Sequence, residues 1–122
     1  MSNMDNINEK YIDETVGITG PEPFIAALRL FRTQVNEYIG NCREYFGKGE
    51  YEDAGKELHK IKGAASSIGL SRLADNAKKM ELDLLKSRRE YGFDAEIAVF
   101  NEMVSEDEVT LGQYLKSLPV SG

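Results

Sequence analysis

The sequence predicts an all-α protein, an antiparallel four-helix bundle with a short additional helix at its N-terminal end. Apolar residues recur in steps of three and four along almost all of the 122 residues, and no strand-like alternation persists. Breaks that contain glycine or proline divide this pattern into four long segments and one short one. Amphipathic helices joined by short connections bury their apolar stripes most simply by packing side by side.

The first two helices are separated by a glycine-to-proline step. A short helix is expected over residues 6–16, starting at Asn6 and ending within residues 17–20. Pro21 and Pro23 mark the start of a long helix, because proline is tolerated in a first turn. Residues 47–49 (Gly-Lys-Gly) should end it. Its apolar stripe consists of Phe24, Leu28, Phe31, Val35, Tyr38, Cys42 and Tyr45.

The third and fourth helices follow the same pattern. Gly69 is placed to end the third helix as a left-handed residue, and Ser71 is expected to help start the fourth. Arg88, Arg89 and Gly92 close the fourth segment. The stripe of the third helix is Tyr51, Ala54, Leu58, Ile61, Ala65 and Ile68, and that of the fourth is Leu73, Ala77, Met80 and Leu84.

A last helical segment is expected over residues 93–118. Its apolar positions are Ile97, Phe100, Val104, Leu111 and Leu115. Ser105 and Glu108 have the spacing of a capping box, which would allow a break there. Residues 1–122 should form a single domain with flexible ends at about residues 1–5 and 119–122.

Composition and charge exclude several classes of function. A net charge of −6 argues against general nucleic-acid binding, which depends on neutralising phosphates. A single cysteine, Cys42, excludes an intramolecular disulfide and fits a reducing cytoplasm, and its place on an apolar stripe indicates a buried thiol. No apolar run is long enough to cross a membrane. The apolar stripes are used up by one bundle, so we expect a cytoplasmic monomer.

His59 is the only histidine of the chain and the best candidate for chemistry. It lies about 100° around the helix from core residue Leu58 and therefore faces solvent. Lys56, Lys60 and Lys62 surround it, and such a basic patch suits a phosphoryl group. The neutral imidazole, with an ordinary pKa of about 6.5, is a nucleophile near pH 7.

Glycines bracket this histidine at one turn on either side, at Gly55 and Gly63, and Ser66 follows. Glycine inside a helix costs about 1 kcal/mol relative to alanine, so we interpret these small residues as a platform that a partner approaches closely. The alternatives are an ordinary surface histidine with solvated lysines, and glycines that admit a neighbouring helix.

The segment 59–73 resembles the signature H-x-x-K-G-x-x-x-x-x-G-x-x-x-L of histidine-containing phosphotransfer (HPt) domains, the relay modules of multistep His-Asp phosphorelays. The resemblance implies that His59 exchanges a phosphoryl group with aspartates of receiver domains, in a hybrid sensor histidine kinase and in a response regulator. It also implies that Lys62 steadies the phosphoryl charge, that Gly63 gives the receiver clearance, and that Glu81 on the next helix orients the imidazole ring. The alternative for Glu81 is an ordinary solvated carboxylate on the helix surface.

The sequence predicts a phosphotransfer protein and no independent enzyme. It contains no G-x-x-x-x-G-K-[ST] nucleotide loop and no carboxylate cluster near His59, so we expect neither cofactor nor metal on this chain, and Mg²⁺ on the partner receiver domain. The alternative is a helical docking adaptor that has lost phosphotransfer. Metal or haem binding through His59 is disfavoured, because no second histidine or nearby cysteine completes a ligand set.

Overall fold

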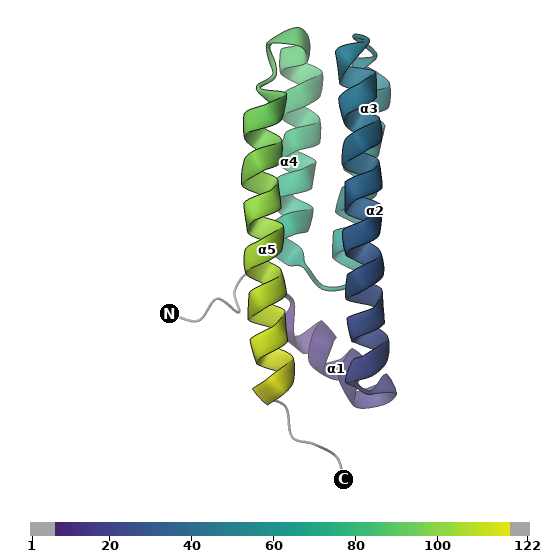
Figure 1. The fold of residues 1–122 in the computed structure, drawn as a ribbon, viewed down its shortest axis with the longest axis vertical. Coiled ribbons are helices and arrows are strands. Elements are labelled where there is room, and N and C mark those ends of the chain that lie inside the picture. Colours follow the sequence, from purple (N-terminus) through teal and green to yellow (C-terminus); the bar gives the residue numbers. More distant parts are fainter. Residues whose placement is uncertain (1–6, 118–122) are drawn as a thin grey trace.

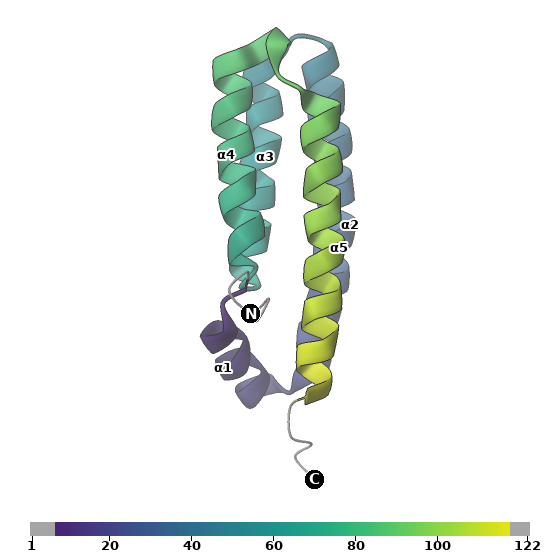
Figure 2. The ribbon, with the colours of Figure 1, turned by 90° about the vertical axis from the view of Figure 1, so that its left-hand side faces the viewer.

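The computed structural model describes residues 7–117, and within this range every regular element is a helix. The elements are α1 (Glu9–Thr19), α2 (Pro21–Gly47), α3 (Tyr51–Ser67), α4 (Ser71–Ser87), a 3-10 turn η2 (Arg88–Glu90) and α5 (Phe93–Ser117). Helices α2 to α5 lie side by side as long rods, and α1 lies across the end of the molecule where α2 begins (Figures 1 and 2). The predicted all-α class is confirmed.

The four long helices close a ring. Helix α3 packs most extensively against α4 and α2, while α5 packs against α4 and returns to contact α2. Helix α1 is fastened to the connection between α3 and α4. The Tyr11 hydroxyl donates a hydrogen bond to the Ser67 carbonyl at 2.6 Å, and the backbone N–H of Asn8 donates one to the Gly69 carbonyl at 2.7 Å.

The predicted apolar stripes form the core. All four stripe residues of α4 are buried, and Leu58, Ile61 and Ala65 of α3 are at most 1% exposed. In α2 the stripe is broader than predicted, since Ile39 is buried while Tyr38 beside it is only partly covered. An α-helix drifts relative to a strict seven-residue repeat, so a neighbouring position takes over along a long helix. Cys42 is fully buried, as expected.

The first helix begins about three residues later than predicted, and it ends within the predicted stretch 17–20. Helix α1 begins at Glu9 because the side chain of Asn8 accepts a hydrogen bond from the Tyr11 amide, which caps the helix there. It continues through Gly17 and ends at Thr19, before Gly20, whose φ of 85° lies in the left-handed region. The predicted starting residue, Asn6, lies outside the described residues.

Three other expectations concern helix ends. Gly69 has a φ of +78° after α3, so its predicted left-handed role is confirmed. Ser71 does not cap α4, because it is already the first helical residue and Leu70 precedes it without a side-chain hydrogen bond. The break that the capping-box spacing at Ser105 would allow does not occur. Helix α5 continues through it because the buried face persists on both sides, at Val104 and Leu111.

The predicted end of the last helix, Leu118, and both predicted flexible ends lie outside the described residues.

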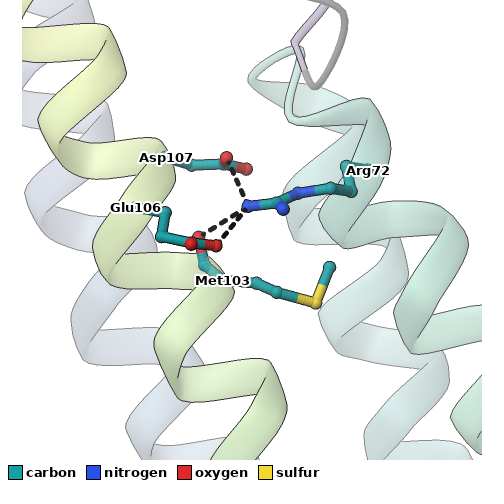
Figure 3. A network of polar contacts seen from close by, with 4 residues as sticks. All are labelled: Arg72, Met103, Glu106 and Asp107. Carbon is teal, nitrogen blue, oxygen red and sulfur yellow. Dashed lines mark hydrogen bonds and ion pairs between the residues drawn. The ribbon is translucent and has the colours of Figure 1, made fainter. Parts of the chain in front are cut away.

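A polar network joins the start of α4 to α5 (Figure 3). The guanidinium of Arg72 donates to Asp107 Oδ1 at 2.9 Å, to Glu106 Oε1 at 3.1 Å and to the Met103 carbonyl at 3.3 Å. Asp107 is 1% exposed, and its desolvation raises the pKa of the carboxyl, an effect that the nearby Arg72 opposes. The sequence pattern did not reveal this contact, which fixes α5 beside the first turn of α4.

Candidate functional site: an exposed histidine on the α3–α4 hairpin

His59 stands on the outer surface of α3. Its neighbour Leu58 is fully buried and Ile61 is 1% exposed, whereas the imidazole side chain is 65% exposed. This contrast follows from the helical period, because residues one position apart point about 100° away from each other. The ring therefore projects from a helix that is packed into the core, and it is open to an approaching molecule.

Glu81 of α4 contacts the ring. Its Oε1 lies 3.2 Å from His59 Nδ1, and its side chain is 22% exposed. A carboxylate can only accept a hydrogen bond, so Nδ1 carries the proton of this contact. In the neutral imidazole the lone pair then resides on Nε2, the nitrogen that Glu81 does not contact. The structure thus brings together two residues that the sequence analysis paired through the family resemblance alone.

The three lysines around His59 have different surroundings. Lys56 lies 3.9 Å from Asp53, whereas Lys60 Nζ is 2.6 Å from Glu57 Oε2 and lies over the ring of Tyr38 in α2, 5.7 Å from its centroid. The hydrogen bond to Glu57 raises the pKa of Lys60. Lys62 has no carboxylate within 4.0 Å among residues 7–117, so its charge is uncompensated by an ion pair there.

The small residues do not form one continuous platform. Gly63 is exposed, and a Cβ added there would meet no atom within 4 Å, while Ser66 is also exposed. Gly55 is buried, and a Cβ added there would lie 3.3 Å from Leu85 Cγ. Its predicted place on a docking platform is wrong, because the missing side chain admits α4 instead.

Sequence reasoning missed one buried carboxylate beside the site. Glu57 is 3% exposed, and its Oε1 accepts a hydrogen bond from the Asn41 amide of α2 at 2.8 Å while its Oε2 contacts Lys60. The only signal in the sequence is the three-residue spacing from Glu57 to Lys60, which is common on exposed helix faces. The contact with Asn41 links the histidine helix to α2.

Two properties of the described residues bear on other classes of function. Among residues 7–117 there is no group of three or more histidine, cysteine or acidic side chains placed to hold a metal ion. Within the same range, no helix has the length and apolar character that a membrane span requires.

The fold and the site together define a class of protein: a helical bundle that presents one exposed histidine, contacted by a carboxylate, on its outer surface. The sequence model of the Hpt domain family matches residues 26–109, which is most of the chain and includes both His59 and Glu81, and the chain therefore belongs to the Hpt domain family. No curated protein and no solved structure matched the chain significantly.

Membership of this family gives the coarse function. Hpt domains are histidine phosphotransfer modules of two-component His-Asp phosphorelays, and they interact with receiver domains of phosphorelay proteins. They are transfer modules and not kinases with nucleotide sites. The chain is accordingly a signalling protein of this class.

Proposed function

We propose that His59 accepts a phosphoryl group from the aspartyl phosphate of a receiver domain and passes it to, or takes it back from, the aspartate of a response regulator. The single observation that carries this proposal is the contact between Glu81 Oε1 and His59 Nδ1 on a ring that is 65% exposed. It keeps the proton on Nδ1 and directs the Nε2 lone pair to the incoming group.

The transfer step balances without a further reactant. Nε2 attacks the phosphorus atom of the aspartyl phosphate in line with the phosphorus–oxygen bond. A nitrogen–phosphorus bond forms, the phosphorus–oxygen bond breaks, and the electron pair of the broken bond leaves on the receiver carboxylate. The proton stays on Nδ1, where Glu81 compensates the positive charge that develops on the ring.

The residues around His59 can be given roles in this phosphoryl transfer. Lys62, which has no ion pair within the described chain, would stabilise the phosphoryl oxygens. Gly63 and Ser66 would leave room for the receiver, and Lys56 and Lys60 would line its docking surface. Mg²⁺ would be held by the receiver domain, whose own carboxylates would supply the ligands.

The wider assignment is also a proposal. The partners would be the receiver domain of a hybrid sensor histidine kinase and that of a response regulator, and the chain would act in the cytoplasm as one domain over residues 1–122. Because the apolar faces of α2 to α5 are buried within a single bundle, we propose a monomer. Light scattering at several concentrations would test this last point.

The decisive experiment is phosphotransfer from a charged receiver. Receivers of the source organism would be labelled with acetyl phosphate and incubated with the wild-type chain and with His59→Gln. We expect label on the wild-type chain alone, labile in acid and stable in alkali. If no receiver labels the wild-type chain, the proposal is wrong and the chain is better described as a docking adaptor.

Glu81 is tested by two substitutions in the same assay. Glu81→Ala removes the acceptor for Nδ1–H and should slow transfer by about tenfold, since general positioning and charge effects of this kind are worth about 1–2 kcal/mol. Glu81→Gln keeps an oxygen acceptor and should recover part of the loss. Equal rates for all three proteins would exclude an orienting role for Glu81.

A further inference from the structure

The register between α3 and α4 places a second lysine beside the histidine. Two contacts between the helices fix this register. His59 of α3 lies against Glu81 of α4. Gly55, four residues before His59, lies against Leu85, four residues after Glu81. Antiparallel helices keep such a correspondence along their length. Three residues beyond His59 in α3 is Lys62, and three residues before Glu81 in α4 is Lys78. These positions are on the same helix faces as the contacting residues, since residues three apart are neighbours on a helix.

Lys62 and Lys78 are two of the lysines that make no ion pair among the described residues. Within residues 7–117 neither has a carboxylate within 4.0 Å, whereas the adjacent lysine of each helix does: Lys60 lies 2.6 Å from Glu57, and Lys79 lies 2.9 Å from Asp83. Two ammonium groups at opposite positions of neighbouring helices repel each other. An anion between them would remove this repulsion, and the nearest reactive group is the imidazole one turn away.

The charge of the hairpin favours such an anion. The α3–α4 hairpin, residues 51–87, carries seven Lys or Arg and six Asp or Glu, whereas the whole chain carries 15 and 21. The hairpin is thus locally positive in an acidic protein. A phosphoryl group brings a charge of about −2 and three acceptor oxygens, more than a single ammonium can compensate.

We propose that Lys78 is a second positioning residue, which together with Lys62 holds the phosphoryl group while His59 carries it. This inference rests on the proposed transfer function. It assigns to α4 a role in stabilising the phosphorylated state, in addition to the contact of Glu81 with the unmodified ring. Lys78 is exposed, so its long side chain is free to turn towards the bound group.

The test measures the equilibrium of transfer and not only its rate. A labelled receiver and the chain are mixed until the ratio of phosphorylated receiver to phosphorylated His59 is constant. Docking contacts cancel from this equilibrium, because both phosphorylated species are compared when they are free. Lys78→Gln should lower the equilibrium constant towards phosphorylated His59 by about threefold to tenfold, as the loss of one charge-assisted contact at an exposed site predicts.

Two further variants serve as controls for Lys78→Gln. Lys79→Gln removes the neighbouring charge, which is paired with Asp83, and should leave the equilibrium constant unchanged. Lys78→Arg should restore the wild-type value, because it restores the positive charge. A Lys78→Gln variant with the wild-type equilibrium constant would overturn the inference even if its KM for the receiver rises, and would leave the transfer function standing. Absence of label on the wild-type chain would overturn both proposals.

Discussion

Replacing Gly63 by alanine should make the protein more stable and less active. Gly63 lies within α3, is exposed, and has no atom within 4 Å of a Cβ built on it. The substitution therefore gains helix propensity, about 1 kcal/mol, without a steric penalty in the free protein. With an unfolding entropy of about 2.1 cal/mol/K per residue, this gain corresponds to a rise in Tm of about 4 °C for a chain of 122 residues.

The same methyl group should obstruct a receiver that approaches His59. Inserting a methyl group into a closely packed contact costs about 1–3 kcal/mol, so transfer at limiting receiver concentration should slow by about tenfold or more. Circular dichroism during heating gives the Tm, and transfer of label from a charged receiver gives the rate. Both measurements use the same preparation. A slower transfer in a protein with a raised Tm is then due to obstruction of the receiver and not to unfolding.

Two other glycines serve as controls. Gly112→Ala in α5 also meets no atom within 4 Å, so it should raise Tm similarly and leave transfer unchanged. Gly55→Ala should gain less stability, because its Cβ would lie 3.3 Å from Leu85 Cγ. A Gly63→Ala variant that is less stable would refute the solvent-facing placement of Gly63. One that is more stable and transfers at the wild-type rate would refute the need for clearance.

Three further predictions concern the rest of the bundle. Gly69→Ala should cost about 2 kcal/mol in urea unfolding, because φ is +78° and the added Cβ would lie 3.0 Å from Tyr11 Cδ1. Burial raises the pKa of the Cys42 thiol to about 12, so a thiol reagent should modify it only as fast as the protein unfolds; rapid labelling of the folded protein would contradict this. Because burial raises the pKa of Asp107 above its ordinary 3.8, the folded protein binds more protons in the window between the two values, and the stability due to this carboxyl falls as pH rises through it. The free energy of unfolding of Asp107→Asn relative to wild type should accordingly increase as the pH rises above 3.8, and the opposite trend would mean that Arg72 outweighs desolvation.

Much of the fold could be predicted because each helix carries a periodic apolar stripe. All four residues of the predicted α4 stripe are buried, with Ala74 buried in addition, and the position of His59 off the α3 stripe matches its exposure. Periodicity shows which face of a helix is apolar, and a four-helix bundle buries all of these apolar faces in one core. The left-handed Gly69 was predictable for a similar local reason, since glycine follows the last periodic residue.

The errors occurred where the outcome depends on contacts between helices. Gly55 looks like Gly63 in the sequence, and only the position of Leu85 distinguishes a packing glycine from an exposed one. The capping-box spacing at Ser105 is overridden by the buried face of α5, which the Arg72–Asp107 contact holds against α4. Local patterns do not contain these long-range contacts.

His59 and Glu81 lie close together in the sequence, because they belong to consecutive helices, α3 and α4. Their contact spans 22 positions, whereas the bond that fastens α5 through Arg72 and Asp107 spans 35. Contacts between nearby segments of the chain close early in folding and at low entropic cost. The hairpin should therefore acquire its arrangement around His59 before α5 docks. Fraying of α5 should change the stability of the molecule more than it changes the geometry at the imidazole.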